Sequence, residues 1–391
     1  MQQQEIHINL LQNNDVKWRS IKDNDDLFQR TSFGVAVYKQ RYIIVVGGNC
    51  KSSKIKSFIY DTKSLTYQTM PNLYPLFLFN LGCVIIDDFL YIMASGAMSF
   101  FILKLQLTSS VTSTISFKYP ATKIWIPIIQ PQTFISDGVD FFVLGREGDF
   151  QRYKNHDKEW EVLPSMKIPC TSYATAIVGD TIYRIGGLHL HKKRRTLASV
   201  EKFHIPTQSW QMSPSLPHPI SNCSAAVVKD RFIVVTGGFR DRKQRSYSST
   251  VFIFDTRSKL WSYPNSHPGK ENSKSKLLQR RYGHKCFSVG KLFFSLGGLS
   301  PGGIYDDGFF SLDVRFLIPN LDKVLCLVLL RELAEKGRAI PDDKIQKYNS
   351  KKSQTKSQIG KTTTVNVDNI IREVVMNFDM DLFRFIISFM H

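Results

Sequence analysis

The side chains best suited to binding a ligand in this sequence are basic, and they lie in four short segments. These are Lys51, Lys54 and Lys56; Lys192, Lys193, Arg194 and Arg195; Arg240, Arg242, Lys243 and Arg245; and Lys270, Lys274, Lys276, Arg280 and Arg281. Arginine forms bidentate contacts with carboxylates and phosphates, and a concentrated positive field speeds association. Because the whole chain has a formal net charge of +19, the sequence predicts an acidic partner.

Catalytic chemistry has little support in the sequence. His189 and His191 would share one face of an extended segment and are the candidate metal ligands, but no acidic or cysteine ligand lies beside them. The chain has no nucleophile elbow, phosphate-binding loop or paired acidic motif. We therefore expect a non-catalytic protein, with no catalytic residue, no metal and no cofactor.

The cysteines and the apolar runs indicate the compartment. The cysteines are scattered without a CxxC pair, which favours a reduced intracellular environment. The first ten residues do not resemble a secretory signal, and the longest purely apolar run, 324–330, is far too short to span a membrane. We expect a cytoplasmic location, with the nucleus as an alternative, and no membrane span.

The basic segments must be positioned by a repeated strand framework. An apolar strand ends on adjacent glycines at Gly47, Gly186, Gly237 and Gly297, and degenerate copies end at Gly96 and Gly145. Such strand-rich units, repeating at about 50 residues, are typical of β-propellers. Ahead of each glycine pair, a shorter strand and a tight polar turn predict an antiparallel hairpin of strands a and b.

A second pair of strands, c and d, follows each glycine pair after a variable polar loop. The clearest copies are "FIYDTKSLTY" at 58–67 and "FIFDTRSKLW" at 252–261, whose turns begin at Asp61 and Asp255. An aromatic residue on strand c is followed seven residues later by one on strand d, as in Phe203 and Trp210. All five tryptophans lie where strand d is expected, which predicts a packing role.

This arrangement resembles the kelch repeat over residues 30–316. The resemblance implies an all-β fold, a six-bladed kelch-type β-propeller with four strands in each blade. It also implies closure of the ring by strands from both ends of the chain, which removes exposed sheet edges. Strand c of the last repeat fits residues 309–314, and Trp18 in "DVKWRSI" has the aromatic expected of strand d. We therefore expect residues 1–317 to form the propeller, with the Trp18 strand completing its last blade.

Residues 318–391 differ from the repeats in composition and in the spacing of apolar residues, and we expect them to form a C-terminal α-helical extension. Helix formers fill 320–337, a Lys-, Ser-, Gln- and Thr-rich segment around 344–363 predicts a disordered basic linker, and apolar residues then recur at helical spacing from Val367 to Phe389. These helices could pack against the propeller, dock a partner or a second copy of the chain, or lie on a membrane surface.

The strand order indicates where a partner would bind. In a four-stranded blade the b–c and d–a loops share one face of the disc, and all four basic segments fall in these loops. The kelch resemblance implies peptide binding on this face, so we expect a protein-interaction module that binds an acidic protein or peptide segment.

Three alternatives remain for the function. A substrate adaptor of a ubiquitin ligase is known among kelch proteins, but the chain has neither a BTB nor an F-box domain. A nucleic-acid-binding propeller would use the same charge, although Tyr247 and Tyr282 are the nearest aromatic residues for stacking bases. A kelch-type metal-dependent enzyme would depend on His189 and His191.

Overall fold

The computed structural model describes residues 18–20, 28–50, 57–70, 82–95, 100–109, 115–128, 130–191, 195–241, 246–262, 280–290, 292–304 and 309–313. These residues are all-β and contain no helix. They belong to a compact unit that spans Asp15–Arg315. The expected C-terminal helices and the linker at 344–363 lie outside the described residues.

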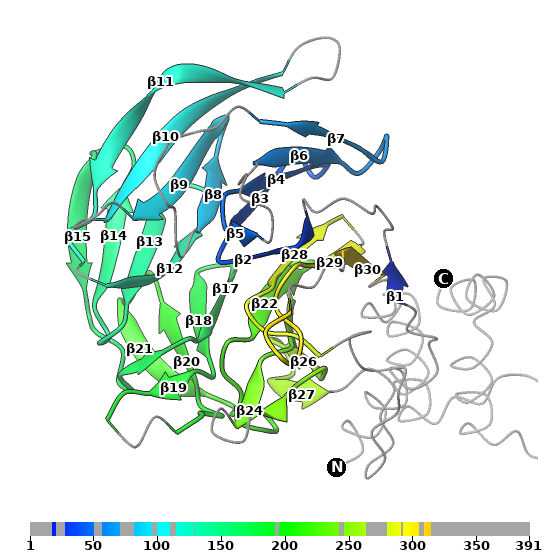
Figure 1. Ribbon diagram of the computed structural model, residues 1–391. Helices are drawn as coiled ribbons and strands as arrows, with labels where there is room; N and C mark the ends of the chain where they lie inside the picture. The colour runs from blue at the N-terminus through cyan, green and yellow to red at the C-terminus, as the bar shows by residue number, and fades with distance from the viewer. Residues whose placement is uncertain are drawn as a thin grey trace, which may run out of the picture. The chain divides into compact units, whose positions relative to one another are not determined.

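The described strands form six four-stranded antiparallel sheets, which are the blades of a propeller (Figure 1). Blade 1 contains β3 (Gly34–Tyr38), β4 (Tyr42–Val46), β6 (Phe58–Asp61) and β7 (Thr66–Thr69). Blade 2 contains β8 (Cys83–Ile86), β9 (Phe89–Ser95), β10 (Phe100–Ser109) and β11 (Ile115–Trp125). Blade 3 contains β12 (Pro131–Ser136), β13 (Phe141–Gly145), β14 (Phe150–Lys154) and β15 (Glu159–Leu163).

The remaining blades follow the same order of strands a, b, c and d. Blade 4 contains β17 (Ala174–Val178), β18 (Thr181–Ile185), β20 (Val200–His204) and β21 (Ser209–Ser213). Blade 5 contains β22 (Ser224–Val228), β23 (Phe232–Thr236), β26 (Val251–Asp255) and β27 (Leu260–Ser262). Blade 6 contains β28 (Lys285–Val289), β29 (Leu292–Leu296), β30 (Phe309–Asp313) and β1 (Trp18–Ser20).

The blades close into a ring through their innermost strands. These strands contact one another in the cyclic order β3, β8, β12, β17, β22 and β28, and β28 returns to β3. In blade 6, β1 pairs antiparallel with β30, with Trp18 opposite Leu312 and Ser20 opposite Phe310. The strand that contains Trp18 is therefore the outermost strand of the sixth blade.

The hydrophobic core lies between neighbouring blades. Strand b is buried along its whole length in β4 and β23, as expected for a strand covered on both faces. Trp210 of blade 4 illustrates the packing between blades, because its ring lies 5.1 Å from the ring of Phe203 and 5.6 Å from Phe150 of blade 3. Trp125 departs from the expected packing role, since its side chain at the end of the longer strand β11 is 61% exposed.

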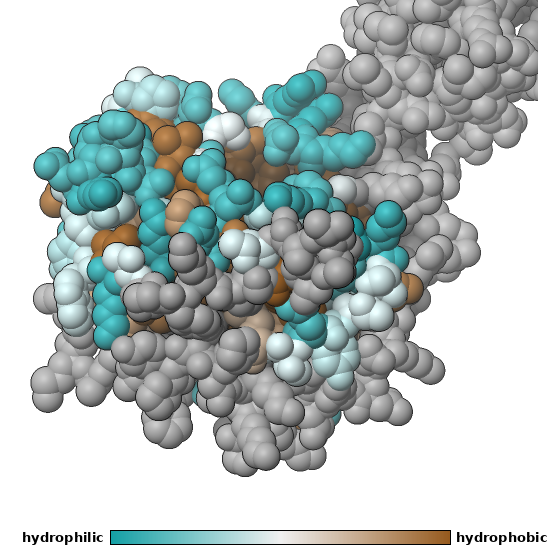
Figure 2. All heavy atoms as spheres, turned by 90° about the horizontal axis from the view of Figure 1, so that it is seen from above, coloured by the Kyte–Doolittle hydropathy of each residue, from teal (hydrophilic) through white to brown (hydrophobic). Residues whose placement is uncertain are grey.

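Exposed hydrophobic side chains are scattered over the described surface. Seen from above (Figure 2), this surface is mostly hydrophilic, with smaller hydrophobic areas between the polar residues. The large exposed hydrophobic side chains among the described residues are spread over five blades; they are Leu65, Tyr67, Trp125, Val139, Val162, Met212 and Ile304. Single exposed residues of this kind are normal in globular proteins.

The intact glycine pairs at the ends of strand b have backbone conformations and close neighbours that favour glycine. In blade 5, Gly237 and Gly238 have φ angles of 63° and 95°, which favour glycine. A Cβ atom on Gly238 would lie 2.4 Å from the carbonyl oxygen of Ser221. A Cβ atom on Gly237 would lie 2.6 Å from the carbonyl oxygen of Arg281 at the start of blade 6, which accepts a hydrogen bond of 2.7 Å from the Gly238 amide. The glycine pairs of blades 4, 5 and 6 are each hydrogen-bonded in this way to the segment that leads into the next blade.

Candidate functional site

The b–c and d–a loops meet on one face of the ring, which we call the b–c/d–a face. The amides of Gly187, Gly238 and Gly298 in b–c loops donate to carbonyls in the segments that lead into the following blade. Segments leading into strand a are also joined to one another, because the Asn222 amide donates to Ser172 and the Gly283 amide to Asn222. Backbone hydrogen bonds thus fix the inner part of this face.

Short two-stranded ribbons extend several of these loops. They pair β2 (Arg30–Thr31) with β5 (Asn49–Cys50), β16 (Cys170–Thr171) with β19 (Leu188–His189), and β24 (Phe239–Asp241) with β25 (Ser246–Tyr247). In each of the first two ribbons, one strand precedes strand a of a blade and the other follows strand b. The third ribbon lies within the b–c connection of blade 5.

Three predicted binding residues lie in these connections with part of their side chains accessible. Arg195 is exposed between β19 and β20, and Arg280 is exposed before strand a of blade 6. Arg240 in β24 is half-buried and donates from Nη2 to Thr250 Oγ1 at 2.9 Å. The other predicted binding residues except Arg281 lie outside the described residues; they are Lys51, Lys54, Lys56, Lys192, Lys193, Arg194, Arg242, Lys243 and Arg245.

Arg281 was predicted to contact a partner, and the structure corrects that prediction. Its side chain is completely buried. Nη1 donates to the carbonyl of Gly297 at 3.0 Å, and the guanidinium lies 4.5 Å from the centre of the Phe310 ring. Arg30 occupies the corresponding position of blade 1, where it donates to the carbonyl of Gly47 at 2.8 Å. Arg281 is therefore a structural residue that holds the end of strand b in its own blade.

A polar cavity of about 200 Å³ opens on the b–c/d–a face between blades 3 and 4. Residues from strand β12 and from separate loops line it, including Gln130, Gln132, Arg146, Thr171, Ser172 and His189. Arg146 Nη1 donates to Gln130 Oε1 at 3.0 Å, and Gln132 Oε1 accepts from Thr171 Oγ1 at 2.5 Å. Arg146 occupies the position that the second glycine takes in the regular repeats, so the degenerate glycine pair was the sequence signal for this site.

A second cavity, of about 340 Å³, lies beside the first where blades 4 and 5 meet. Its walls are largely apolar and include Ile168, Leu197, Ala198 and Pro219, while Arg195 contributes a charge. His189 lines both cavities. Its Nδ1 lies 3.1 Å from the backbone nitrogen of His191, which donates to it. A neutral His189 ring therefore carries its proton on Nε2 and can donate from that atom.

His189 and His191, the candidate metal ligands of the sequence, lie near each other in the structure. Their rings are 6.2 Å apart. Among the described residues, no group of three or more histidine, cysteine, aspartate or glutamate side chains could hold a metal ion. The same described part of the chain contains no helix with the length and hydrophobicity that a membrane crossing requires.

On the opposite face, acidic side chains are paired with arginines. Arg41 binds Asp61 through two hydrogen bonds of 2.8 and 2.6 Å and holds the pKa of that carboxyl well below its usual range. Arg231 binds Asp255 in the same way, at 2.7 and 2.6 Å. Burial alone would raise the pKa of Asp255, but the bonds from Arg231 and the Arg257 amide lower it on balance.

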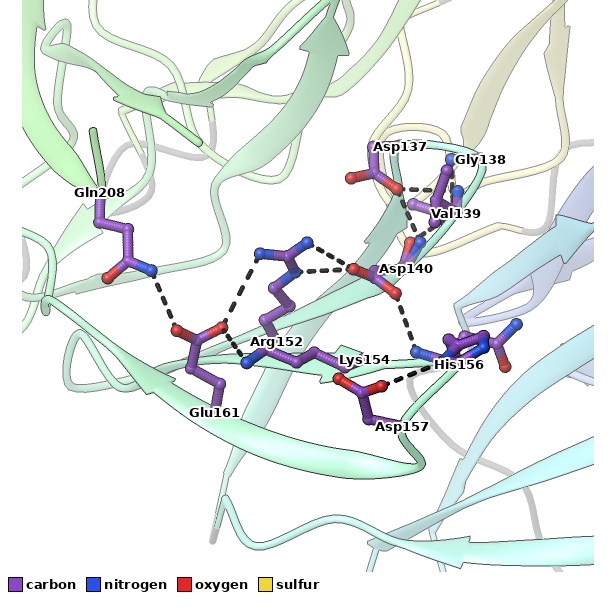
Figure 3. Close-up of polar contacts among 12 residues, drawn as sticks. Asp137, Gly138, Val139, Asp140, Arg152, Lys154, His156, Asp157, Glu161 and Gln208 are labelled. Carbon is purple, nitrogen blue, oxygen red and sulfur yellow. Dashed lines mark hydrogen bonds and ion pairs between the residues drawn. The ribbon is translucent and has the colours of Figure 1, made fainter. Parts of the chain in front are cut away.

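Blade 3 has a larger network of the same kind (Figure 3). Arg152 binds Asp140, with 2.6 Å between Nη2 and Oδ2, and lies 3.8 Å from Glu161. Lys154 lies 3.7 Å from the same glutamate, and Gln208 of blade 4 donates to it at 3.0 Å. These carboxylates serve to join strands within blade 3 and to join blade 3 to blade 4.

Comparison with known proteins supports the repeat assignment. Residues 219–268 match the Kelch motif, a segment that begins before strand a of blade 5 and continues beyond its strand d. No curated protein matches the chain. The match contains the glycine pair at Gly237 and the aromatic pair Phe254 and Trp261, on which the resemblance was based. The protein is therefore a six-bladed β-propeller that carries a kelch motif in its fifth blade.

Proposed function

We propose that this protein is a non-catalytic protein-interaction module that binds an acidic segment of a partner through its b–c/d–a face. Propellers with kelch motifs usually serve in protein interaction, and loops held by a rigid scaffold are where binding residues concentrate. The formal net charge of +19 favours a partner of opposite sign.

The observation that carries the proposal is where the basic segments begin and end. The segment with Lys51, Lys54 and Lys56 follows β5, and the segment 242–245 connects β24 to β25. The segment 192–194 lies between His189 and Arg195, whose backbone groups are hydrogen-bonded at 2.9 Å. Since these flanking residues belong to b–c connections, each of the three segments starts and finishes on the same face.

Charge reversal on this face tests the proposal. Partners captured by the full chain would be compared with those captured by a variant carrying glutamate at Arg194, Arg195, Arg240 and Arg242. An Arg257→Glu variant is the matched control, because Arg257 is exposed in the c–d turn of blade 5 on the opposite face. We expect the four-site variant to lose its acidic partners and the control to keep them. An unchanged set of partners in the four-site variant would contradict the assignment of the face.

Single-stranded nucleic acid is the second candidate, and one cluster of aromatic rings favours it. The rings of Phe239, Tyr247 and Tyr282 lie 4.4 to 5.6 Å apart beside Arg240. Phe239 is buried, however, and the two tyrosines are half-buried against it, so little ring surface is left for bases. Binding of an oligonucleotide that weakens steeply with salt would favour this candidate over a peptide.

A ubiquitin-ligase adaptor is a narrower form of the main proposal. It requires a ligase subunit among the captured partners, bound together with a second, acidic protein. Self-association through residues 318–391 would appear as a concentration-dependent mass in sedimentation of the full chain.

A further inference from the structure

We infer that the two cavities around His189 form the anchor of the partner site. The polar cavity takes a carboxylate side chain of the partner, and the neighbouring cavity takes an apolar side chain two residues away. This inference rests on the proposed function and adds to it the position of the site and the chemistry of the bound segment.

Arg146 is the main hydrogen-bond donor in the polar cavity. Arg146 uses Nη1 to bind Gln130, and its backbone amide donates to the Gln130 carbonyl at 3.0 Å, so the residue is held at both ends. A guanidinium has five N–H groups, which suit a carboxylate. Gln132 accepts from Thr171 through Oε1, and its Nε2, which donates to the Pro131 carbonyl at 3.5 Å, carries a second N–H group. His189 also lines this cavity.

The charge of the two cavities favours an anionic occupant. Among the described residues that line them, none is acidic, whereas Arg146 and Arg195 are basic. Both arginines keep part of their side chain accessible to solvent. A carboxylate entering the polar cavity would therefore meet complementary charge, and no ion pair of Arg146 with another described residue would have to be displaced.

The apolar cavity has walls that are already fixed in place. The Leu197 amide donates to Gly187 at 2.8 Å, the Leu197 carbonyl accepts from Ile220 at 3.0 Å, and the Ala198 carbonyl accepts from Leu216 at 2.8 Å. A preformed wall reduces the conformational entropy that binding would otherwise remove. An aliphatic or aromatic side chain of the partner fits this environment better than a polar one.

The shared residue sets the spacing of the bound segment. Because His189 lines both cavities, the two are neighbours on one surface. Successive side chains of an extended peptide point to opposite faces, so two that enter cavities on one surface are two positions apart, which is about two strand rises of 3.3 Å. We therefore commit to an extended peptide with an aspartate or glutamate close to an apolar residue as the occupant.

Selection of peptides tests this inference without knowledge of the natural partner. The full-length chain would be immobilised and used to select binders from a displayed library of random 12-residue peptides. Selected peptides would then be labelled, and their dissociation constants measured by fluorescence anisotropy. We expect the selected peptides to share an acidic residue with an apolar residue two positions away.

Matched variants assign the two halves of the motif. Arg146→Glu should weaken binding by about tenfold or more, as expected for loss of a charge-assisted hydrogen bond. Thr196→Trp should fill the apolar cavity, which Thr196 lines, and weaken the same peptides. The Arg257→Glu control should bind as the unmodified protein does. In the peptide, glutamate-to-glutamine replacement should weaken binding to the unmodified chain but have little further effect on Arg146→Glu.

The outcomes distinguish this inference from the proposed function. Acidic peptides that bind equally well to Arg146→Glu and Thr196→Trp would overturn the site while leaving the proposed function intact. Selection of no acidic peptide would overturn both. If a phosphoserine peptide binds in place of the carboxylate peptide, the occupant named here is wrong. The peptide replacements keep the inference testable even if Thr196→Trp does not fold, because they use the unmodified chain.

Discussion

A buried ion pair in blade 4 gives the sharpest test of how this propeller is stabilised. Arg184 and Glu201 have fully buried side chains, and Nη2 of the arginine lies 2.5 Å from Oε2 of the glutamate. Arg184 Nη1 also donates to the carbonyls of Gly186 and Ser199, at 2.8 and 3.1 Å. The other oxygen of Glu201 accepts from the Lys167 amide at 3.0 Å. The pair thus joins strands b and c to the glycine turn and to the segment before strand a.

Removing only the acid should be costly. In a Glu201→Ala variant, the guanidinium of Arg184 would stay buried without its counter-charge, and the Lys167 amide would lose its acceptor. Breaking a buried pair in this way typically costs about 3–5 kcal/mol. Natural domains have unfolding free energies of about 5–15 kcal/mol, so this single change would remove a large share of the stability.

Urea unfolding followed by tryptophan fluorescence would measure the effect. Trp210 reports on the same blade, since its ring contacts Phe203 on β20. The informative comparison is with the double variant Arg184→Met and Glu201→Leu, in which no charge remains buried. We expect the double variant to be more stable than Glu201→Ala. A loss below about 1 kcal/mol for Glu201→Ala, or a double variant that is less stable than the single one, would refute the reasoning.

Three further predictions concern the repeat itself. Gly237→Ala should destabilise the fold by more than the ~1–2 kcal/mol that a left-handed backbone alone costs, because the added Cβ would lie 2.4 Å from His284. The control is Gly179→Ala, where nothing lies within 4 Å of the added Cβ, so that the same urea assay measures the backbone cost alone. Burial lowers the pKa of His284 well below 6.5, so the unfolded chain binds a proton that the folded chain does not, and the unfolding free energy should fall below pH 6.5 by up to about 1.4 kcal/mol per pH unit. His284→Asn should reduce this slope, and an unchanged slope would assign it to other groups. Trp210→Phe should cost about 1 kcal/mol in urea unfolding, because it removes the 2.7 Å hydrogen bond from Nε1 to the carbonyl of Pro164 that links two blades; a value near zero would make this bond dispensable.

The sequence predicts the propeller well because the features that build it repeat. The glycine pairs mark the ends of strand b, as the φ angles at Gly237 and Gly238 explain. The seven-residue spacing of Phe203 and Trp210 places the two rings opposite each other on paired strands. These signals depend on residues close together in the chain, which is why they can be recognised without coordinates.

Burial of charge cannot be predicted in the same way. Arg281 belongs to a basic segment and has the same side chain as its exposed neighbour Arg280, yet the two have opposite environments. Phe310 and the carbonyl of Gly297 contact the buried Arg281 side chain. Both are distant from Arg281 in the sequence, so no local pattern predicts either contact.

The cavities were missed for a related reason. Gln132 lies in strand β12, whereas Arg146, Thr171 and His189 come from three separate connections between blade strands, and the blade that supplies Gln132 and Arg146 is a degenerate repeat. A residue that differs from the repeat consensus is easily disregarded when repeats are aligned. Here Arg146 replaces the second glycine and supplies a side chain at a position where the regular repeats have none. Only the arrangement of the blades brings these residues together.

The pairing of β1 with β30 has a consequence for folding during synthesis of the chain. During synthesis, the strand that contains Trp18 leaves the ribosome before any of the blades, but its only partner strand among the described residues is made after five blades are already complete. This strand must therefore remain without its sheet until nearly the whole propeller has been translated, and until then the ring stays open beside β3.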